Sequence, residues 1–409
     1  MSSALKQIFL MIRVNLGSLP RRLAISLSMV LSVALVVAVL AGFLAMARGF
    51  EAALAGAGSP DIAIVLGGGT NQETGSEVPA EAIRSLAAMG GDSGIARNPG
   101  IARDGAGEPA LSRETVVPVD IRQGDGTEQT LSLRGMDVTG PDLRERARLS
   151  QGRLFSPGAR EIVVGARIAD TLPGFAVGDT IRLGALDWRI VGHFTSGGSA
   201  FESEIWADLE PMQSAFDRQG QVQSLRVRLD GAGDPATALA ALRDRLSALP
   251  GTPLTVVSET DFYAGQAERT ESLIRLFGWP IALLMAIGAT AGALNTMMSS
   301  VSDRSVEIAT LRLLGFARLP VFAASWVEAV LLSLAGAGLG VLASGLAFDG
   351  WQASTMGANH TKMAFQLDVS GAVILTAGLL GLAIGILGGA LPAIAATRLP
   401  LTSALRARG

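Results

Sequence analysis

The chain alternates between long apolar runs and stretches in which apolar and polar residues are mixed. Four runs are almost free of charge: Leu23 to Ala47, Leu276 to Met298, Val321 to Phe348 and Val369 to Ala396. A helix of roughly 20 apolar residues crosses a hydrocarbon core about 30 Å thick. The pattern therefore predicts a membrane protein with four transmembrane α-helices.

Residues 48–270, between the first two runs, follow strand and helix periods in turn and carry most of the charge. This pattern predicts a large extracytoplasmic α+β domain between helices 1 and 2. Eight segments are rich in β-branched and aromatic residues and predict strands. These are Ile62 to Leu66, Thr115 to Val119, Glu161 to Val164, Thr180 to Leu183, Trp188 to Phe194, Glu204 to Ala207, Leu225 to Leu229 and Leu254 to Val257.

Two helices are predicted in this domain. One starts at Pro235, where Asp234 can cap it, and ends at Pro250-Gly251. Its leucines at 239, 242, 246 and 249 share one face. The other runs from Pro79 to Met89 and is stopped by Gly90-Gly91.

Composition agrees with a chain that lies partly in lipid. Of 409 residues, 49% are hydrophobic and 17% are charged, and the mean hydropathy is +0.41. A net charge of -3 disfavours nucleic-acid binding, which requires a basic field. Cysteine is absent, which excludes disulfides and thiolate metal sites.

The distribution of lysine and arginine in the short loops predicts the topology. The short segment 349–368 carries Lys362 alone. The other short segments carry Lys6, Arg13, Arg21, Arg22, Arg304, Arg312, Arg318, Arg398, Arg406 and Arg408. By the positive-inside rule, both termini and the segment 301–320 face the cytoplasm, and the large domain faces outward.

These observations divide the chain into nine segments. The first span could instead be a cleaved signal peptide, because Arg21-Arg22 precede it, but its 25-residue run is too long for a signal core. Leu5, Ile8, Phe9, Ile12 and Leu16 predict an amphipathic helix before it. The segments are 1–22 (cytoplasmic amphipathic helix), 23–47 (span 1), 48–270 (outer domain), 271–300 (stalk end and span 2), 301–320 (cytoplasmic helix), 321–348 (span 3), 349–368 (short outer loop), 369–397 (span 4) and 398–409 (cytoplasmic tail).

A search for chemistry yields no catalytic or metal site. The run VLGGGT at 65–70 follows a strand, but no Gly-Lys-Ser/Thr follows it, and the chain has no complete Walker A pattern. The two histidines, His193 and His360, are far apart in sequence, so we interpret both as structural.

Small residues recur at every fourth position in spans 2 to 4, a spacing that lets helix backbones approach closely. The glycines in these series are Gly288, Gly292, Gly336, Gly340, Gly381, Gly385 and Gly389. Glu328 lies one to two turns inside the third span. It is interpreted as a polar anchor between helices or a proton site, or else as a side chain that reaches the headgroups.

The charged segment SDRSVEIATLRLLGFARLP at 302–320 separates two spans. A helix over 303–316 would place Val306, Ala309, Leu313 and Phe316 on an apolar stripe facing the membrane or the spans. Its other face mixes charged and apolar residues, which is typical of a docking surface. That face comprises Asp303, Arg304, Glu307, Ile308, Leu311 and Leu314, and Gly315 permits the turn back to the membrane.

Three stretches carry a resemblance to a known family. SVEIATLRLLGFARLPVFAASWVEAVLLSLAGAGLGVL at 305–342 and GGALPAIAATRLPLTSALR at 388–406 resemble the C-terminal half of the macrolide-exporter and FtsX-like ABC permeases. EIVVGARIADTLPGFAVGDTIRLGALDWRIVGHF at 161–194 resembles the family's periplasmic core. With the order of one span, a large domain and three spans, the resemblance covers nearly the whole chain.

The resemblance implies a permease in the bacterial inner membrane whose helix at 303–316 docks on a separate cytoplasmic ABC ATPase dimer. It implies a second permease chain as a partner and leaves open whether a membrane-fusion protein takes part. No cofactor would bind this chain, because ATP and Mg²⁺ belong to the ATPase, and the chain would not be an enzyme by itself. The substrate class stays open among lipoproteins, peptides, lipids and drugs.

Three other functions stay open. An FtsX-like member would activate a periplasmic partner without transport. An orphan sensor or adhesin would need no ATPase, and a membrane enzyme would need a constellation of catalytic residues that the sequence does not show.

Overall fold

The computed structural model describes the chain as two compact units. The helical unit comprises Met1–Arg48, Ser272–Trp351 and Leu367–Gly409, and the sheet unit comprises Gly49–Glu271 and Gln352–Gln366. Within these, the described residues are 3–18, 20, 23–88, 101–103, 107–122, 126, 128–230, 234–249, 253–356 and 361–398. The predictions for Arg21, Arg22, Met89, Gly90-Gly91, Pro250-Gly251, His360 and most of the tail 398–409 lie outside them.

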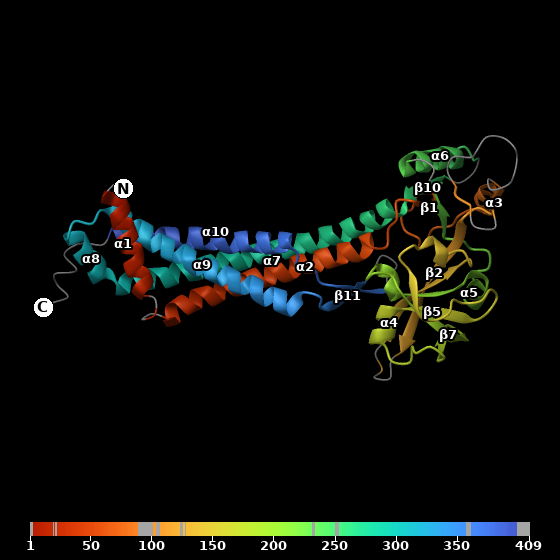
Figure 1. The fold of residues 1–409 in the computed structure, drawn as a ribbon, viewed down its shortest axis with the longest axis horizontal. Coiled ribbons are helices and arrows are strands. Elements are labelled where there is room, and N and C mark those ends of the chain that lie inside the picture. The colour runs from red at the N-terminus through yellow and green to blue at the C-terminus, as the bar shows by residue number, and fades with distance from the viewer. Residues whose placement is uncertain are drawn as a thin grey trace. The chain divides into compact units, whose positions relative to one another are not determined.

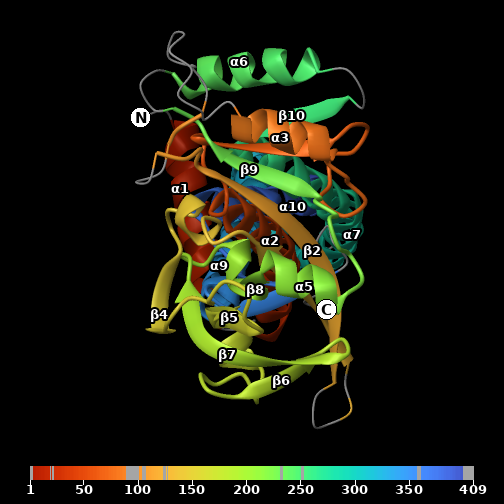
Figure 2. The same ribbon diagram turned by 90° about the vertical axis from the view of Figure 1, so that its right-hand side faces the viewer.

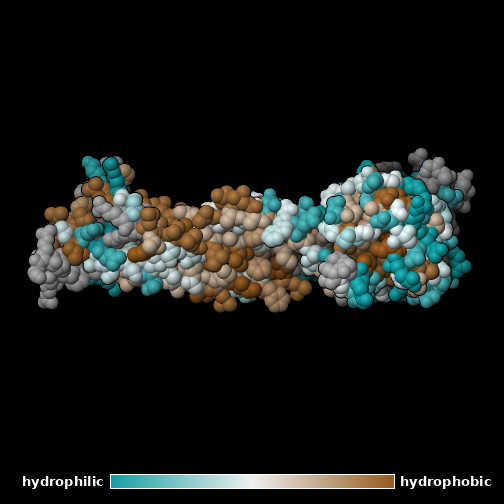
Figure 3. Space-filling model, turned by 90° about the horizontal axis from the view of Figure 1, so that it is seen from below, coloured by the Kyte–Doolittle hydropathy of each residue, from teal (hydrophilic) through white to brown (hydrophobic). Residues whose placement is uncertain are grey.

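Four of the helices are long and apolar enough to span a membrane, in the order the sequence predicts. Their exposed surface is broadly hydrophobic (Figure 3) because leucines and isoleucines cover it. Two shorter helices, α1 and α8, lie at one end of the helical unit (Figure 1). The helices are α1 (Ser3–Ser18), α2 (Leu23–Ala55), α7 (Glu259–Asp303), α8 (Ser305–Leu313), α9 (Arg318–Phe348) and α10 (Gly371–Thr397).

Five of the seven predicted packing glycines lie where neighbouring helices approach closely. A Cβ on Gly336 or Gly340 of α9 would lie 2.6 or 2.5 Å from a backbone oxygen of α2. The α10 glycines Gly381, Gly385 and Gly389 lie against side chains of α9. Gly288 and Gly292 of α7 differ, because no described atom comes within 4 Å of a Cβ placed there.

Gly340→Ala should therefore destabilise the helical unit, whereas Gly338→Ala should not. The added Cβ at 340 would meet the Ala34 carbonyl oxygen and force α9 away from α2, and such overpacking costs about 1–3 kcal/mol. Gly338, on the same helix, faces open space, so alanine there gains helix propensity of up to about 1 kcal/mol. Thermal unfolding in detergent measures both variants, and equal midpoints would contradict the close packing.

The sheet unit is built on one 10-stranded sheet of order β10-β1-β9-β2-β3-β8-β5-β7-β4, with β6 paired to β7. Figure 2 shows its strands with α3 and α6 beside β1, β9 and β10. The strands are β1 (Ile62–Gly67), β2 (Leu111–Arg122), β3 (Glu128–Met136), β4 (Arg148–Gly152), β5 (Glu161–Gly165), β6 (Thr180–Leu183), β7 (Leu186–Thr195), β8 (Glu204–Asp208), β9 (Ser224–Arg228) and β10 (Leu254–Ser258). The helices are α3 (Ala80–Ala88), α4 (Ala166–Thr171), α5 (Leu209–Ala215) and α6 (Pro235–Ser247).

Two apolar cores flank the middle of this sheet. One lies under α3 and α6, where Leu86, Leu242 and Leu246 pack on β1 and β9. The other lies between α4, α5 and the strands from β2 to β7, around Trp188 and Met212. Each core buries the alternate residues of its strands, which is why the period-two pattern located them.

All eight predicted strands are present, but four further strands were missed. β3 and β4 were not predicted, and the segment expected to be a short loop contains the hairpin β11 (Gln352–Met356) and β12 (Lys362–Gln366). The hairpin belongs to the sheet unit, where the Ser203 hydroxyl accepts a hydrogen bond from the Ala364 amide at 3.0 Å. β11 is mostly polar and gave no apolar alternation that could predict a strand, and β12 alternates Met363 and Phe365 over only five residues.

One capping prediction was wrong. The Asp234 side chain makes no capping hydrogen bond, and its carbonyl oxygen instead accepts from the Thr237 and Ala238 amides. The helix still starts at Pro235, because proline at the first turn suits the helical φ and needs no acceptor.

Candidate functional site

The helix between the second and third spans is shorter than predicted. α7 ends at Asp303, Arg304 departs from helical geometry with φ -101° and ψ 10°, and α8 covers only Ser305–Leu313. The predicted single helix over 303–316 is therefore broken at its start and ends earlier. The break lets α8 change direction relative to α7.

The end of α8 has the geometry that the sequence predicted at Gly315. Gly315 has a φ of +94°, which glycine adopts without strain. Its amide donates to the Arg312 carbonyl at 3.1 Å, and the Phe316 amide donates to the Leu311 carbonyl at 3.2 Å. Phe316 and Leu311 also pack against the same apolar cluster, so this is a Schellman motif with its hydrophobic contact.

The two faces of α8 are not divided as predicted. Arg304 and Ile308, expected on the docking face, are buried at 6% and 5% exposure. Of the predicted apolar stripe, Ala309 is buried and Phe316 half-buried, whereas Val306 and Leu313 are exposed at 39% and 53%. The sequence could not decide the rotation, because a nine-residue helix with apolar residues on both sides has two plausible inner faces.

The residues exposed on α8 and its cap form one stripe at helical spacing. Leu314 is the most exposed of them, at 73%, and the Glu307 side chain is 63% exposed. We call this set the α8 stripe. It comprises Val306, Glu307, Thr310, Leu313 and Leu314.

Three buried polar side chains hold the start of α8. Glu328 of α9 accepts hydrogen bonds from Arg304 Nη1 and from Asn15 Nδ2 of α1, each at 3.1 Å. Arg304 Nη2 also donates to Asn15 Oδ1, which closes the triangle. Glu328 is thus a polar anchor in this structure, buried at 4% exposure, and its side chain does not extend to the surface of the helical unit.

An apolar cluster continues this anchor along the inner face of α8. Ile308 packs with residues from every neighbouring helix, and Arg312 Nη1 donates to the Thr397 carbonyl at the end of α10 at 2.9 Å. The cluster members are Met11 of α1, Val301 of α7, Ile308 of α8, Val321 and Ala324 of α9, and Ala396 of α10. A displacement of α8 would therefore reach four other helices.

A second polar cluster, which the sequence reading missed, lies buried in the sheet unit. The guanidinium groups of Arg134, Arg144 and Arg226 all bind Glu114, at 2.8 to 2.9 Å. Arg134 also binds Glu73 at 2.7 Å. Further members are Glu204, Glu259 and Tyr263. We call this set the arginine cluster. Its members are far apart in the sequence, and only the fold brings them together.

The arginine cluster is charged in the folded protein. Burial alone raises the pKa of Glu73, but the charges of Arg134 and Arg226 outweigh it and hold that pKa at about 2, against an ordinary 4.5. Burial likewise opposes ionisation of Glu114, yet Arg144, Arg226 and Arg134 hold its pKa well below the usual range. Both carboxylates thus stay ionised near neutral pH.

The arginine cluster also fixes the first turn of α7. Arg226 Nη1 contacts the Glu259 carboxylate, and its Nη2 donates to the Tyr263 hydroxyl at 3.0 Å. Glu259 and Tyr263 open the helix that ends at Asp303, beside α8.

His193, the histidine that the structure describes, contacts a backbone carbonyl. His193 Nε2 lies 2.6 Å from the Phe175 carbonyl oxygen, a contact between β7 and the loop that joins α4 to β6. Among the residues that the structure describes, no group of three His, Cys, Asp or Glu side chains could hold a metal ion.

Comparison with known families covers most of the chain. Residues 25–245 match the MacB-like periplasmic core domain, and residues 280–401 match the FtsX-like permease C-terminal domain. The chain belongs to the MacB/FtsX-like family of ABC transporter permeases. Both matched regions are of the permease type, and neither is an ATPase domain.

Curated relatives of this permease are longer proteins. The macrolide export ATP-binding/permease protein MacB of Bordetella avium is 28% identical over an alignment of 302 positions that covers 68% of this chain and 45% of that protein. MacB of Vibrio parahaemolyticus is 30% identical over 234 residues, which are 56% of this chain and 35% of that protein. The chain thus spans less than half the length of these relatives.

Among solved structures, the periplasmic region of MacB from Actinobacillus actinomycetemcomitans matches half of this permease. It covers 50% of the chain and 92% of that structure, at 13% identity and a TM-score of 0.39.

Proposed function

We propose that the permease is the membrane subunit of an ABC transporter and is driven by a separate ATPase that docks on the α8 stripe. ATP hydrolysis there would move α8, and the sheet unit would respond by exporting or extracting a lipoprotein, peptide, lipid or drug. ATP and Mg²⁺ would be held by the ATPase, and this chain would bind no cofactor.

The α8 stripe is the observation that carries this proposal. It leaves Leu313, Leu314 and Val306 uncovered by the rest of the helical unit, beside the charge of Glu307. Burial of exposed leucines gives affinity, and a charge among them fixes register, so such a surface suits a protein groove. The opposite face of α8 is held by the Asn15–Arg304–Glu328 anchor, so a push on the stripe is transmitted to the spans.

Transmission to the sheet unit would use α7. This helix runs without interruption from Glu259 to Asp303, and its first turn is bound by Arg226. Motion at α8 could therefore reach the arginine cluster through one covalently continuous helix.

The remaining assignments follow the family. We place the permease in a bacterial inner membrane, with both termini and α8 in the cytoplasm and the sheet unit in the periplasm. A second permease chain would complete the assembly, and the open faces of Gly288 and Gly292 on α7 suit such a contact. A membrane-fusion protein is a further possible partner.

Leu314→Asp should abolish co-purification of the ATPase with this permease. Leu314, the C-cap residue of α8, is the most exposed apolar residue of the α8 stripe, so the variant places a charge in the docked interface without disturbing the fold. Losing an interface anchor of at least 2 kcal/mol lowers affinity by roughly 30-fold. Pull-down from detergent extracts, followed by ATPase assay of the eluate, measures the loss.

Val138→Asp is the matched control, since Val138 is an exposed valine of the sheet unit at 51% exposure. It should leave co-purification unchanged. Full ATPase recovery with Leu314→Asp would contradict docking on the stripe.

A further inference from the structure

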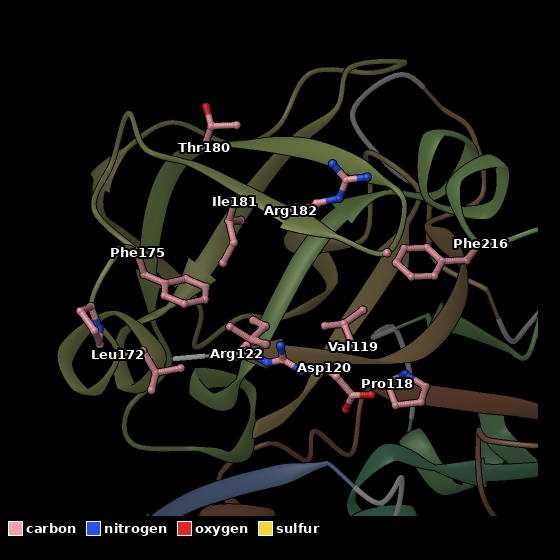
Figure 4. A pocket seen from close by; sticks show the side chains of 14 residues that line it. Pro118, Val119, Asp120, Arg122, Leu172, Phe175, Thr180, Ile181, Arg182 and Phe216 are labelled. Atoms are coloured by element: carbon pink, nitrogen blue, oxygen red, sulfur yellow. The ribbon is translucent and has the colours of Figure 1, made fainter. Parts of the chain in front are cut away.

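A groove in the sheet unit, between β2 and β6, offers a ligand little open apolar surface. Its volume is about 760 Å³, and Figure 4 shows the side chains that line it. Val119 and Phe175 in its floor are already buried at 3% exposure, and Arg122 at its rim pairs with Glu128. The helical unit differs, because one of its short helices leaves apolar and basic side chains uncovered together.

That helix is α1, and one of its faces is not covered by any described residue of the helical unit. Phe9, Leu10 and Val14 are exposed there, with Phe9 at 66%. Lys6 and Arg13 are also exposed, and the five positions recur at helical spacing, so they share one side of the helix. We call these five residues the α1 face.

The opposite side of α1 is fixed to the spans. Met11 is buried at 3% exposure and packs with Val321 and Ala324 of α9. Asn15, one turn further along α1, donates to the Glu328 carboxylate at 3.1 Å. These contacts set the rotation of α1, so the α1 face is turned away from the helix bundle.

The level at which α1 meets α9 is that of the boundary between lipid headgroups and acyl chains. α9 has 31 residues and is about 46 Å long, whereas the hydrocarbon core is about 30 Å thick. A centred span therefore leaves about 8 Å, or roughly five residues, outside the core at each end. Val321 and Ala324, which pack with Met11, are the fourth and seventh residues of α9. Figure 1 shows α1 crossing the ends of the spans there, as an interfacial helix does.

The positive charges at this level are not balanced by acidic residues of α1. The helix contains no Asp or Glu, and Lys6 and Arg13 form no ion pair with a described residue. These two residues are about two turns, or about 10 Å, apart, so both long side chains can reach one phosphate group. Arg318, exposed one turn before Val321 on α9, adds a third cation. An anionic headgroup complements this charge.

We propose that the α1 face binds a phospholipid with an anionic headgroup. Its phosphate would lie between Lys6 and Arg13, and its acyl chains would cover Phe9, Leu10 and Val14. A free phosphate ion would leave these apolar residues uncovered, and a zwitterionic headgroup would bring a further cation beside Lys6 and Arg13. Only a lipid that carries net negative charge supplies both parts.

A bound lipid would also act on the start of α8. Asn15 of α1 is hydrogen-bonded to Arg304 and to Glu328, so a lipid that holds α1 in place also holds this anchor. The lipid site itself does not rest on ATPase docking at the α8 stripe.

Binding is tested with the full-length permease in an uncharged detergent. Phosphatidylglycerol and phosphatidylcholine with the same acyl chains are titrated separately, and native mass spectrometry measures the lipid bound to the permease. Phosphatidylglycerol should bind saturably and about tenfold more tightly, because each basic residue beside an anionic headgroup raises affinity about fivefold. This preference should shrink as the ionic strength is raised from about 0.05 M to about 0.5 M. Equal affinity for the two lipids would overturn the proposal.

Lys6→Glu combined with Arg13→Glu supplies the test on the protein side. The double variant should lower the affinity for phosphatidylglycerol about tenfold or more and leave phosphatidylcholine binding unchanged. Arg182→Glu combined with Arg189→Glu is the matched control, because it makes the same change in net charge at exposed residues of the sheet unit. The control should bind phosphatidylglycerol as the wild type does. An equal loss in both double variants would refute a site on α1.

Three further measurements distinguish the lipid from other occupants. Inorganic phosphate at the same concentration should not displace phosphatidylglycerol, and displacement would show that a free anion fills the site instead. If the α1 double variant fails to fold, hydrogen exchange on the wild type decides: phosphatidylglycerol should slow exchange of the α1 amides, and unchanged exchange at saturation would contradict the proposal. Loss of ATPase co-purification with unchanged lipid binding in the α1 double variant would make the α1 face a protein-docking surface and not a lipid site.

Discussion

Glu328→Ala is expected to destabilise the helical unit by about 3–5 kcal/mol. The substitution removes the buried carboxylate that pairs with the Arg304 guanidinium and leaves it only the longer contact with the exposed Glu307 at 3.6 Å, and a poorly compensated buried charge is costly. Glu328 lies ten residues after Arg318, the first residue of α9, or about 15 Å along the helix. Unfolding by titration with a denaturing detergent measures the loss.

The double variant Arg304→Met with Glu328→Met separates lost charge balance from lost packing. It removes both charges and fills the space with apolar side chains, so it should recover most of the stability. Glu328→Gln, which keeps hydrogen-bonding capacity but not charge, should fall between the wild type and Glu328→Ala. Wild-type stability of Glu328→Ala would contradict the prediction, because it would show that the anchor does not stabilise the helical unit.

Glu114→Gln should destabilise the sheet unit by a similar amount, about 3–5 kcal/mol. Among the described residues, Glu114 is the one carboxylate that binds all three arginines of the arginine cluster, so its loss leaves their charges short of a partner. Glu128→Gln is the matched control, because it breaks a glutamate–arginine pair whose side chains are 60% and 74% exposed. Exposed pairs contribute at most about 1 kcal/mol. Urea unfolding monitored by tryptophan fluorescence compares the two variants, and equal losses would contradict the buried cluster.

The same cluster predicts how stability depends on pH. The pKa of Glu73 falls from 4.5 to about 2 on folding, so the unfolded chain binds more protons between these values. The contribution of Glu73 ionisation to the free energy of unfolding is complete above pH 4.5 and is lost as the pH falls toward 2. In Glu114→Gln, the free energy of unfolding should fall less steeply as the pH is lowered from 6 to 2, as measured by urea titrations at each pH. A wild-type profile no steeper than that of the variant would contradict the depressed pKa values.

Periodicity predicted the elements well because each one buries a regular set of apolar residues. The four spans and eight strands of the sheet unit follow from runs and alternation that exist in the sequence. β3 and the β11–β12 hairpin were not predicted, because part of their length is polar and exposed. Gly315 was predicted correctly because a local motif, the αL cap, decides its conformation.

Less of the candidate site could be predicted from the sequence. The sequence selected α8 and Glu328 but assigned Arg304 and Ile308 to the wrong face of the helix. Their burial depends on Asn15, which is 289 residues from Arg304, and on an apolar cluster drawn from five helices. The α1 face likewise depends on which side of that helix Met11 and Asn15 hold against the spans.

By itself, then, the sequence determined the membrane-spanning character, the order of the parts and the short charged helix between spans, because these rest on local hydropathy and turn chemistry. Tertiary structure alone decided which side of α8 is free, which glycines meet a neighbour and where eight charged and polar side chains gather in the sheet unit. Such contacts join residues far apart in the chain, and their energies depend on burial and geometry that no local pattern encodes.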